Sequence, residues 1–204
     1  MIFLILGGCR VEVGFWFAAG TAFLLLGDPA GIGIIGYLAA VIHESGHLMV
    51  MKALGVPAVC VRCGLFGLEI LEEKRCRKSY WADMLIALAG PLANGVAFLL
   101  LLPVQYVTAS PFAMGFLSAN GIMAIFHLLP VEPLDGGQAL YAGFCRRMPP
   151  ARAEKICRVI SFLTLLPLGI LGFSVLLYSR YNFSLLLVSL YLLLLMLLKK
   201  GRYY

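Results

Sequence analysis

Residues 31–54 read GIGIIGYLAAVIHESGHLMVMKAL, an apolar run that two histidines and a glutamate interrupt. About 20 mostly apolar residues are enough for one helix to cross a bilayer. Ionisable groups at membrane depth are energetically costly and usually mark a functional site. The run therefore predicts a membrane helix whose chemistry is carried by His43, Glu44 and His47.

The whole chain has the composition of a membrane protein. Of its 204 residues, 62% are hydrophobic and 13% are charged, whereas soluble domains average about 25% charged residues. We predict an all-α polytopic membrane protein with about six transmembrane helices. The stretches that qualify are 11–27, 31–54, 81–102, 112–129, 156–178 and 181–198.

Basic residues gather on one side of these predicted spans. They precede the first span, separate the second from the third and the fourth from the fifth, and follow the sixth. Only Arg180 falls on the other side. The positive-inside rule then places both termini in the cytosol. The net charge of +6 accordingly indicates topology and contact with anionic lipids, and we expect no nucleic-acid partner.

The first ten residues, MIFLILGGCR, loosely resemble a lipoprotein signal, but they lack a basic n-region. We expect an uncleaved lead-in at the membrane surface. All six cysteines fall on the predicted cytosolic side, where reduced thiols are expected. Cys60 and Cys63 have the spacing of half a metal or redox site. No second pair matches it, so we interpret them as ordinary cysteines.

His43 and His47 are four residues apart, so they share one face of a helix. With Glu44 they form H-E-x-x-H, the zincin arrangement, in which two imidazoles hold Zn²⁺ and the glutamate is the general base. The alternative is a chance match, with both histidines hydrogen bonded inside a helix bundle. The chain has three histidines, and two of them form this motif within a predicted span. We therefore favour one zinc ion per chain.

A catalytic zinc takes three protein ligands and keeps one position open. The stretch HLLPVEPLDGGQAL (127–140) follows the fourth span, where the chain returns to the cytosolic side. Its prolines break the helix, and Gly136 and Gly137 allow a sharp turn. We predict that Asp135 is the third ligand, with Glu132 as a rival. The alternative for Asp135 is a simple helix N-cap.

These motifs resemble the site-2 protease family of intramembrane zinc metalloproteases, especially the bacterial branch that processes a sporulation sigma-factor precursor. HESGH (43–47) matches the family's H-E-x-x-H, and LLPVEPLDGG (128–137) matches its L-L-P-x-x-P-L-D-G-G segment. AGPLAN (89–94) resembles its G-P-x-x-N element. The resemblance implies a single transmembrane metalloprotease domain over 1–204, with its core at 10–158 and additional helices at 159–204.

The same resemblance implies a zinc metalloendopeptidase, an integral protein of the bacterial cell membrane. Its substrate would be a transmembrane or membrane-tethered protein, cleaved near the cytosolic face to release a sigma or transcription factor. The sporulation branch usually carries a C-terminal nucleotide-sensing domain, and other branches carry a PDZ domain. We expect neither in this chain, so that regulation would come from a partner membrane protein.

His127 departs from the family pattern, which usually has asparagine at this position. That asparagine is thought to position the substrate or the reacting carbonyl, and we interpret His127 as a hydrogen-bond donor on the substrate side. An incidental change and a zinc ligand are the alternatives. Asn120 on the same helix and Asn94 in AGPLAN are further candidates for substrate or oxyanion contacts. For Asn94, helix packing is the favoured alternative.

Residues 56–81 begin as β-rich sequence and predict a short β-hairpin or re-entrant segment between the second and third spans. An exposed strand edge there would hold an extended substrate by strand addition. An ordinary amphipathic loop is the alternative, and 71–78 reads as a solvated, headgroup-facing stretch. The last two spans are leucine-rich and lipid-facing, and they are candidates for a substrate gate.

Two other functions are weighed against proteolysis. The first is a catalytically inactive homologue that binds membrane proteins, but the intact Glu44 argues against it because a binder needs no base. The second is a metal transporter, which requires further ligands along a pathway. The spans offer few polar candidates for such a pathway.

Overall fold

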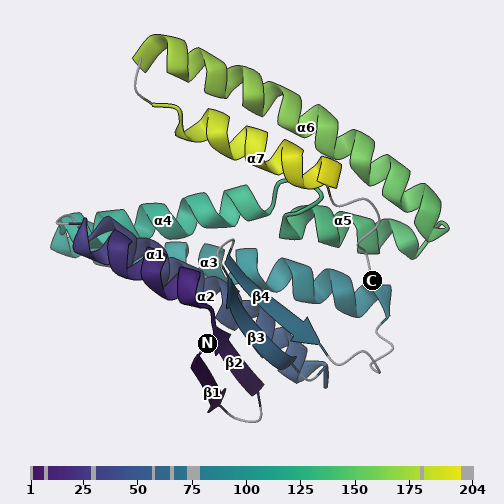
Figure 1. The fold of residues 1–204 in the computed structure, drawn as a ribbon, viewed down its shortest axis with the longest axis horizontal. Helices are drawn as coiled ribbons and strands as arrows, with labels where there is room; N and C mark the ends of the chain where they lie inside the picture. Colours follow the sequence, from purple (N-terminus) through teal and green to yellow (C-terminus); the bar gives the residue numbers. More distant parts are fainter. Residues whose placement is uncertain are drawn as a thin grey trace. The chain divides into compact units, whose positions relative to one another are not determined.

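The computed structural model describes residues 2–6, 9–28, 31–56, 58–64, 67–72, 79–179 and 182–198. These residues form four strands and seven helices (Figure 1). In chain order they are β1 (Ile2–Leu6), β2 (Cys9–Val13), α1 (Phe15–Leu26), α2 (Ile32–Ala53), β3 (Ala58–Gly64), β4 (Gly67–Glu72), α3 (Tyr80–Thr108), α4 (Pro111–His127), α5 (Asp135–Cys145), α6 (Pro150–Ser179) and α7 (Ser184–Leu198).

Each of the six predicted spans overlaps one of these helices. By length and composition, α2, α3 and α6 can cross a membrane, and α4 and α7 are shorter apolar helices. The count of six spans therefore stays a prediction for the remaining helices. Helix α5 was not predicted, because its 11 residues are too few to produce a membrane-length apolar signal.

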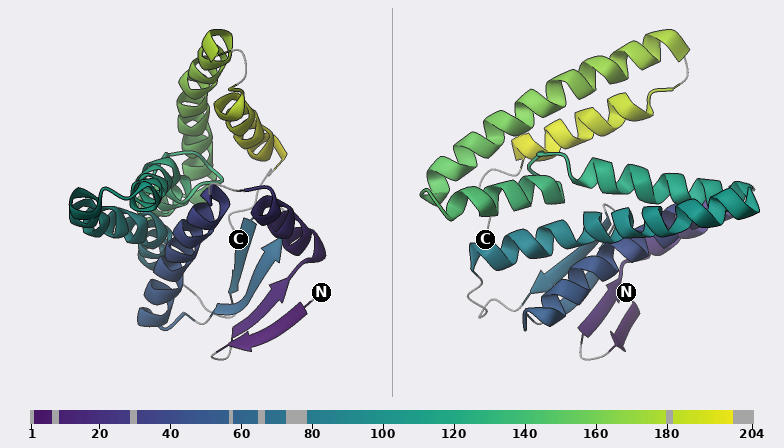
Figure 2. Two further views of the ribbon diagram at one scale, coloured as in Figure 1. Left: turned by 90° about the vertical axis from the view of Figure 1, so that its left-hand side faces the viewer. Right: turned by 180° about the vertical axis from the view of Figure 1, so that it is seen from behind.

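The strands form one sheet in the order β1–β2–β3–β4 (Figure 2). β3 and β4 pair antiparallel, which confirms the hairpin predicted between the second and third spans. β2 pairs antiparallel with β1 and parallel with β3. The expected start of the first span at residue 11 is wrong, because Cys9–Val13 is a strand. The alternation of polar and apolar residues in CRVEV has the strand period of two and was the missed signal.

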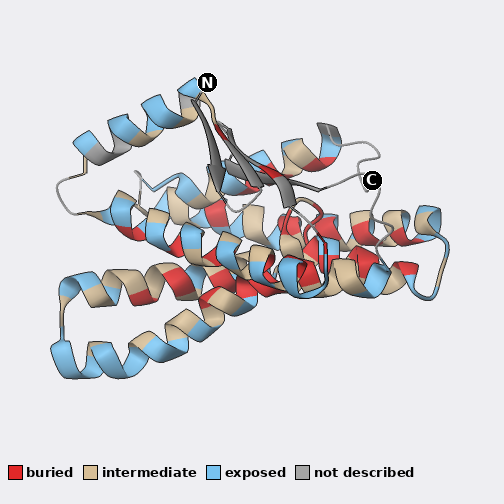
Figure 3. Ribbon diagram, turned by 90° about the horizontal axis from the view of Figure 1, so that it is seen from below, coloured by how far each residue is buried: buried red, intermediate tan, exposed pale blue. Residues whose placement is uncertain are grey.

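The chain divides into two compact units. The first comprises Met1–Ala82 and Ala89–Ile125; in it, α1 packs on β3 and α2. Helix α1 is largely exposed (Figure 3), as expected of an apolar helix that lipid covers. Helices α2 and α3 touch backbone to backbone, since a Cβ placed on Gly46 would lie 2.5 Å from the Ala89 carbonyl oxygen. Small residues at both positions allow this close approach of the two helices.

The second unit comprises Asp83–Leu88 and Phe126–Tyr204. Helices α6 and α7 lie side by side in it (Figures 1 and 2). Val131 and Leu134, from the connection between α4 and α5, are buried in one apolar cluster with residues of α6 and α7. A second cluster joins α5 to α6 through Tyr141, Cys145, Ala153 and Cys157. The leucine-rich helices α6 and α7 thus pack against the segment that leads to Asp135.

Cys60, Cys145 and Cys157 are buried and take part in no disulfide, and the cytosolic placement of the cysteines stays a prediction. Many of the basic residues behind the predicted orientation, including those at 73–78 and 199–202, lie outside the described residues. The solvated stretch predicted at 71–78 lies largely outside them as well. The cytosolic placement of both termini therefore stays a prediction.

Candidate metal centre

Helix α2 places the two histidines of HESGH one turn apart on its buried face. His43 is 2% exposed and His47 is 8% exposed. Their Nε2 atoms lie 3.2 Å apart. Two nitrogens bound to one tetrahedral zinc at about 2.0–2.1 Å are themselves roughly 3.3–3.4 Å apart. The pair thus has the spacing of two ligands to a single ion.

Asn94 on α3 sets the tautomer of His43. The Asn94 amide nitrogen donates to the Ala39 carbonyl and to Asn120 Oδ1, at 2.9 Å each. Its oxygen therefore faces His43 Nδ1, at 2.7 Å. An amide oxygen only accepts, so His43 Nδ1 carries the proton and Nε2 carries the lone pair of the ring. This is the tautomer that a metal at Nε2 requires.

Asn120 on α4 completes the hydrogen-bond chain behind His43. Its amide nitrogen donates to the Phe116 carbonyl at 2.8 Å, while its oxygen accepts from Asn94. Both asparagines are fully buried. Together they link α2, α3 and α4 and support His43 from behind. Their substrate or oxyanion role stays a prediction.

Gly90 on α3 leaves space directly against both histidine rings. A Cβ at this position would lie 2.3 Å from His47 Nε2 and 2.8 Å from His43 Nε2. Any side chain at position 90 would displace the two Nε2 atoms of His43 and His47, which lie close together here. Gly90 was not among the site residues predicted from the sequence. The available signal was a glycine inside a helix, which is about 1 kcal/mol less favourable than alanine and thus needs a packing or functional reason.

Glu44 follows His43 on α2 and is half-buried. Its place in the motif is beside the two histidines on the same turn, where a general base for a metal-activated water is expected. Ser45, the next residue, is exposed and donates to the Val41 carbonyl at 2.6 Å. Ser45 is thus a local structural residue, which makes it a useful comparison for Glu44.

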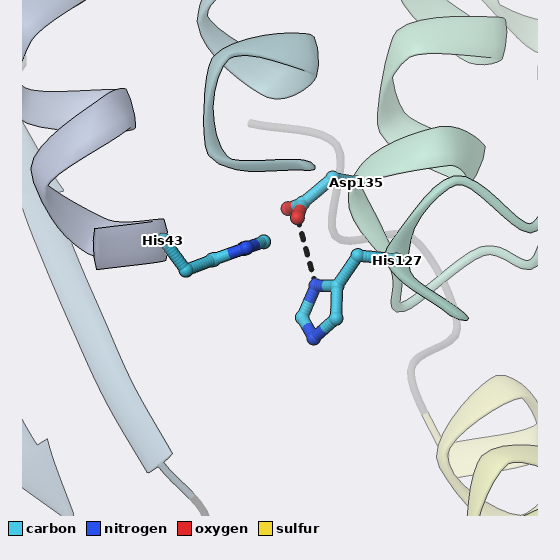
Figure 4. Close-up of side chains that lie close together, drawn as sticks. All are labelled: His43, His127 and Asp135. Carbon is cyan, nitrogen blue, oxygen red and sulfur yellow. Dashed lines mark hydrogen bonds and ion pairs between the residues drawn. The ribbon is translucent and has the colours of Figure 1, made fainter. Parts of the chain in front are cut away.

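In the second unit, α4 ends at His127 and α5 begins at Asp135. His127 Nδ1 lies 2.8 Å from Asp135 Oδ2 (Figure 4). The N-cap of α5 is Leu134, and no side chain caps it, so Asp135 is not the capping residue of the alternative interpretation. As the first helical residue, its carboxylate is favoured by the positive end of the helix dipole.

The segment between α4 and α5 is anchored to α6. Glu132 N–H donates to Ser161 Oγ at 2.9 Å, and the Ser161 hydroxyl donates to the Pro130 carbonyl at 3.3 Å. Ser161 is fully buried. This anchoring role of Ser161 was not predicted from the sequence, although a polar serine within an apolar span could have indicated it. Glu132, the rival ligand, is itself buried.

Gly136 and Gly137 are required for close approach, which corrects the predicted sharp turn. Both lie in the first turn of α5, and neither has a positive φ. A Cβ on Gly136 would lie 2.3 Å from the Leu128 carbonyl oxygen, and one on Gly137 would lie 2.2 Å from that of Val131. The glycines let the start of α5 pack against the preceding backbone.

No family model matches the chain. A candidate zinc metalloprotease of Synechocystis sp. is 35% identical over 124 residues, which are 56% of this chain and 32% of the relative. A zinc metalloprotease of Methanocaldococcus jannaschii is 26% identical over 152 residues, 71% of this chain and 44% of the relative. The chain thus spans less than half the length of either curated relative.

A solved structure decides the fold. The site-2 protease from Methanocaldococcus jannaschii superimposes with a TM-score of 0.67 at 22% sequence identity, covering 100% of this chain and 96% of that one. The chain has the site-2 protease fold. In this site-2 protease fold, α2 carries HESGH, α3 carries AGPLAN, and α5 begins with Asp135. The likeness to the sporulation branch stays a prediction.

Proposed function

We propose that this chain is an intramembrane zinc metalloprotease of the site-2 type. The observation that carries the proposal is the pair of Nε2 atoms on α2, 3.2 Å apart, with the tautomer of His43 set by Asn94. The site-2 protease fold and two curated relatives named as zinc metalloproteases support it.

In this proposal His43, His47 and Asp135 hold one zinc ion. Two imidazoles and one carboxylate are a donor set of known catalytic zinc sites, and the chain offers these donor types. The space beside Gly90 supports the fit, because a Cβ would occupy it. His127 remains the alternative to His47 as the second imidazole. When bound, zinc acts as a Lewis acid that makes water a competent nucleophile near neutral pH.

Glu44 takes the proton of the attacking water and then delivers it to the leaving amine. General acid–base catalysis of this kind contributes about 10²–10⁴-fold to the rate. The substrate has to be extended at the cleaved bond, since a helix sequesters its peptide groups. β4 lies at one edge of the sheet, where an extended segment of the substrate can pair by strand addition. His127, Asn120 and Asn94 stay proposed contacts to the substrate or the oxyanion.

The proposed substrate class rests on the resemblance of HESGH and LLPVEPLDGG to the motifs of site-2 proteases. We propose a transmembrane or membrane-tethered protein, cleaved near the cytosolic face to release a regulator such as a sigma or transcription factor. A second membrane protein regulates the cleavage, and the chain acts as one transmembrane domain with both termini in the cytosol. The bacterial cell membrane is the proposed location.

The test compares host cells that carry the wild type, Glu44→Gln or Ser45→Ala, by mapping protein termini in membrane and cytosolic fractions. We expect one membrane-tethered protein to accumulate intact with Glu44→Gln, while its cytosolic fragment disappears. The Ser45→Ala control should match the wild type. Purified Glu44→Gln should still bind one zinc, since Glu44 is not a ligand. The wild type could also be expressed and loaded with zinc while the protein termini in its cells match those in Glu44→Gln cells under all growth conditions. That result would favour a binding protein without protease activity.

A further inference from the structure

The segment from the end of α4 to the start of α5 holds two side chains in a fixed relation. Within it, Val131 N–H donates to the Leu129 carbonyl and Leu134 N–H donates to the Val131 carbonyl, both at 2.8 Å. Ser161 binds the segment to α6, and Val131 and Leu134 are buried in the cluster with α6 and α7. Such a hydrogen-bonded and packed connection sets the separation of the residues at its two ends.

Those two end residues are His127 and Asp135, whose Nδ1 and Oδ2 atoms lie 2.8 Å apart (Figure 4). An ionised carboxylate only accepts hydrogen bonds, so His127 Nδ1 donates. Both side chains are mostly shielded, with exposed fractions of 27% for His127 and 14% for Asp135. A hydrogen bond to a carboxylate in such surroundings is worth more than one at the open surface.

We propose that His127 is a positioning residue for the metal ligand Asp135. Its Nδ1–H holds Oδ2 and so fixes the rotation of the carboxylate that would bind the zinc. This inference rests on the proposed function, because it takes Asp135 as a ligand. It differs from the earlier interpretation of His127 as a substrate-side donor, since the Nδ1 proton is committed to Asp135.

Hydrogen-bond partners of metal ligands orient them and raise their basicity, and loss of such a partner typically lowers metal affinity about 10–100-fold. His127→Ala removes the donor, and His127→Phe removes it while keeping a ring. His127→Asn keeps a side-chain N–H but is a poor zinc ligand. The asparagine variant therefore separates a positioning role from direct coordination.

The experiment measures zinc affinity of the purified full chain in detergent by competition with a chromophoric chelator. We expect a 10–100-fold weaker Kd for His127→Ala and His127→Phe, and a value within about threefold of wild type for His127→Asn, whose amide still donates to the carboxylate. The exposed neighbour Leu128 provides the control Leu128→Ala, which should leave the Kd unchanged. The absorption spectrum of the cobalt-loaded chain should keep its four-coordinate form in all variants.

Three results would overturn the inference. Equal zinc affinity in wild type, His127→Ala and His127→Phe would show that the hydrogen bond does not support the ligand. An asparagine variant as weak as the alanine variant, with an altered cobalt spectrum, would make His127 a direct ligand. A wild type that binds no zinc would overturn the proposed metal centre as well. If the wild type binds zinc and the His127 variants bind it equally well, only this inference fails, and the proposed protease function stands.

Discussion

Asn94 Oδ1 accepts from His43 Nδ1 at 2.7 Å, across 51 positions of sequence. The contact turns the lone pair of a buried histidine toward its neighbour His47. Because the Asn94 amide nitrogen is held by Ala39 and Asn120, the amide cannot reverse without losing both bonds. The tautomer of a proposed metal ligand is therefore set by helix packing.

Replacing Asn94 should weaken zinc binding and stability together. Asn94→Ala leaves the buried His43 N–H and the Asn120 amide oxygen without this partner, which costs about 1–3 kcal/mol per group, and loss of the tautomer support lowers zinc affinity about 10–100-fold. Asn94→Asp keeps the acceptor for His43 but loses both donated bonds. The aspartate variant should therefore retain more zinc affinity than the alanine variant. Its melting temperature should be lower than that of the wild type. Chelator competition and thermal melting give the two values, and unchanged zinc affinity in Asn94→Ala contradicts the assignment.

Gly90→Ala should abolish zinc binding even though alanine is the better helix former. Its Cβ would lie 2.3 Å from His47 Nε2, so the ring has to turn away from the shared position. Gly95 on the same helix faces open space, since a Cβ there would meet nothing within 4 Å, so Gly95→Ala is the matched control. Alanine should stabilise α3 by about 0.5–1 kcal/mol in the control, with zinc content unchanged. Metal analysis of the purified variants checks this prediction. A Gly90→Ala variant that still holds its zinc would show that the space beside Gly90 is not needed for zinc binding.

Ser161→Ala should loosen the segment that leads to Asp135. The change removes the hydroxyl that binds Glu132 N–H and the Pro130 carbonyl, leaving buried backbone groups unpaired at about 1–3 kcal/mol each. Ser174 on α6 is exposed and bonds only its own helix, at the Ile170 carbonyl. Ser174→Ala should therefore melt like the wild type. Faster amide exchange at residues 131–134 in Ser161→Ala alone is the expected result. Equal exchange in the two variants would mean that α6 does not anchor the segment.

Zinc should raise the melting temperature of the wild type, since a ligand that binds only the folded chain stabilises it by about 2.7 kcal/mol at 100 times its Kd. Chelation should reverse the rise. His43→Ala and Asp135→Ala should lose it, whereas Glu44→Gln should keep it because Glu44 is a base and not a ligand. His47→Ala distinguishes the donor set with His47 from the donor set with His127. If zinc still raises the melting temperature of this variant, His127 is favoured over His47 as the ligand beside His43 and Asp135.

Several features of the fold were predictable because they depend on local sequence. Apolar runs of membrane length located α2, α3 and α6. The β-rich stretch after α2 located the β3–β4 hairpin. The parallel pairing of β2 with β3 joins segments that α1 and α2 separate, and no local pattern predicts such a register. Helix α5 was missed for a related reason, since it is stabilised by packing on α6.

The sequence by itself determined the donor groups of the proposed site: four-residue spacing places His43 and His47 on one helical face, and LLPVEPLDGG carries the carboxylate of Asp135. Only the tertiary structure decided how these groups are held. Asn94 behind His43, the space beside Gly90, Ser161 under the Asp135 segment and His127 against Asp135 are all contacts between different elements. Spacing along one helix follows from backbone geometry, whereas such contacts depend on how helices and loops pack, which local periodicity does not encode.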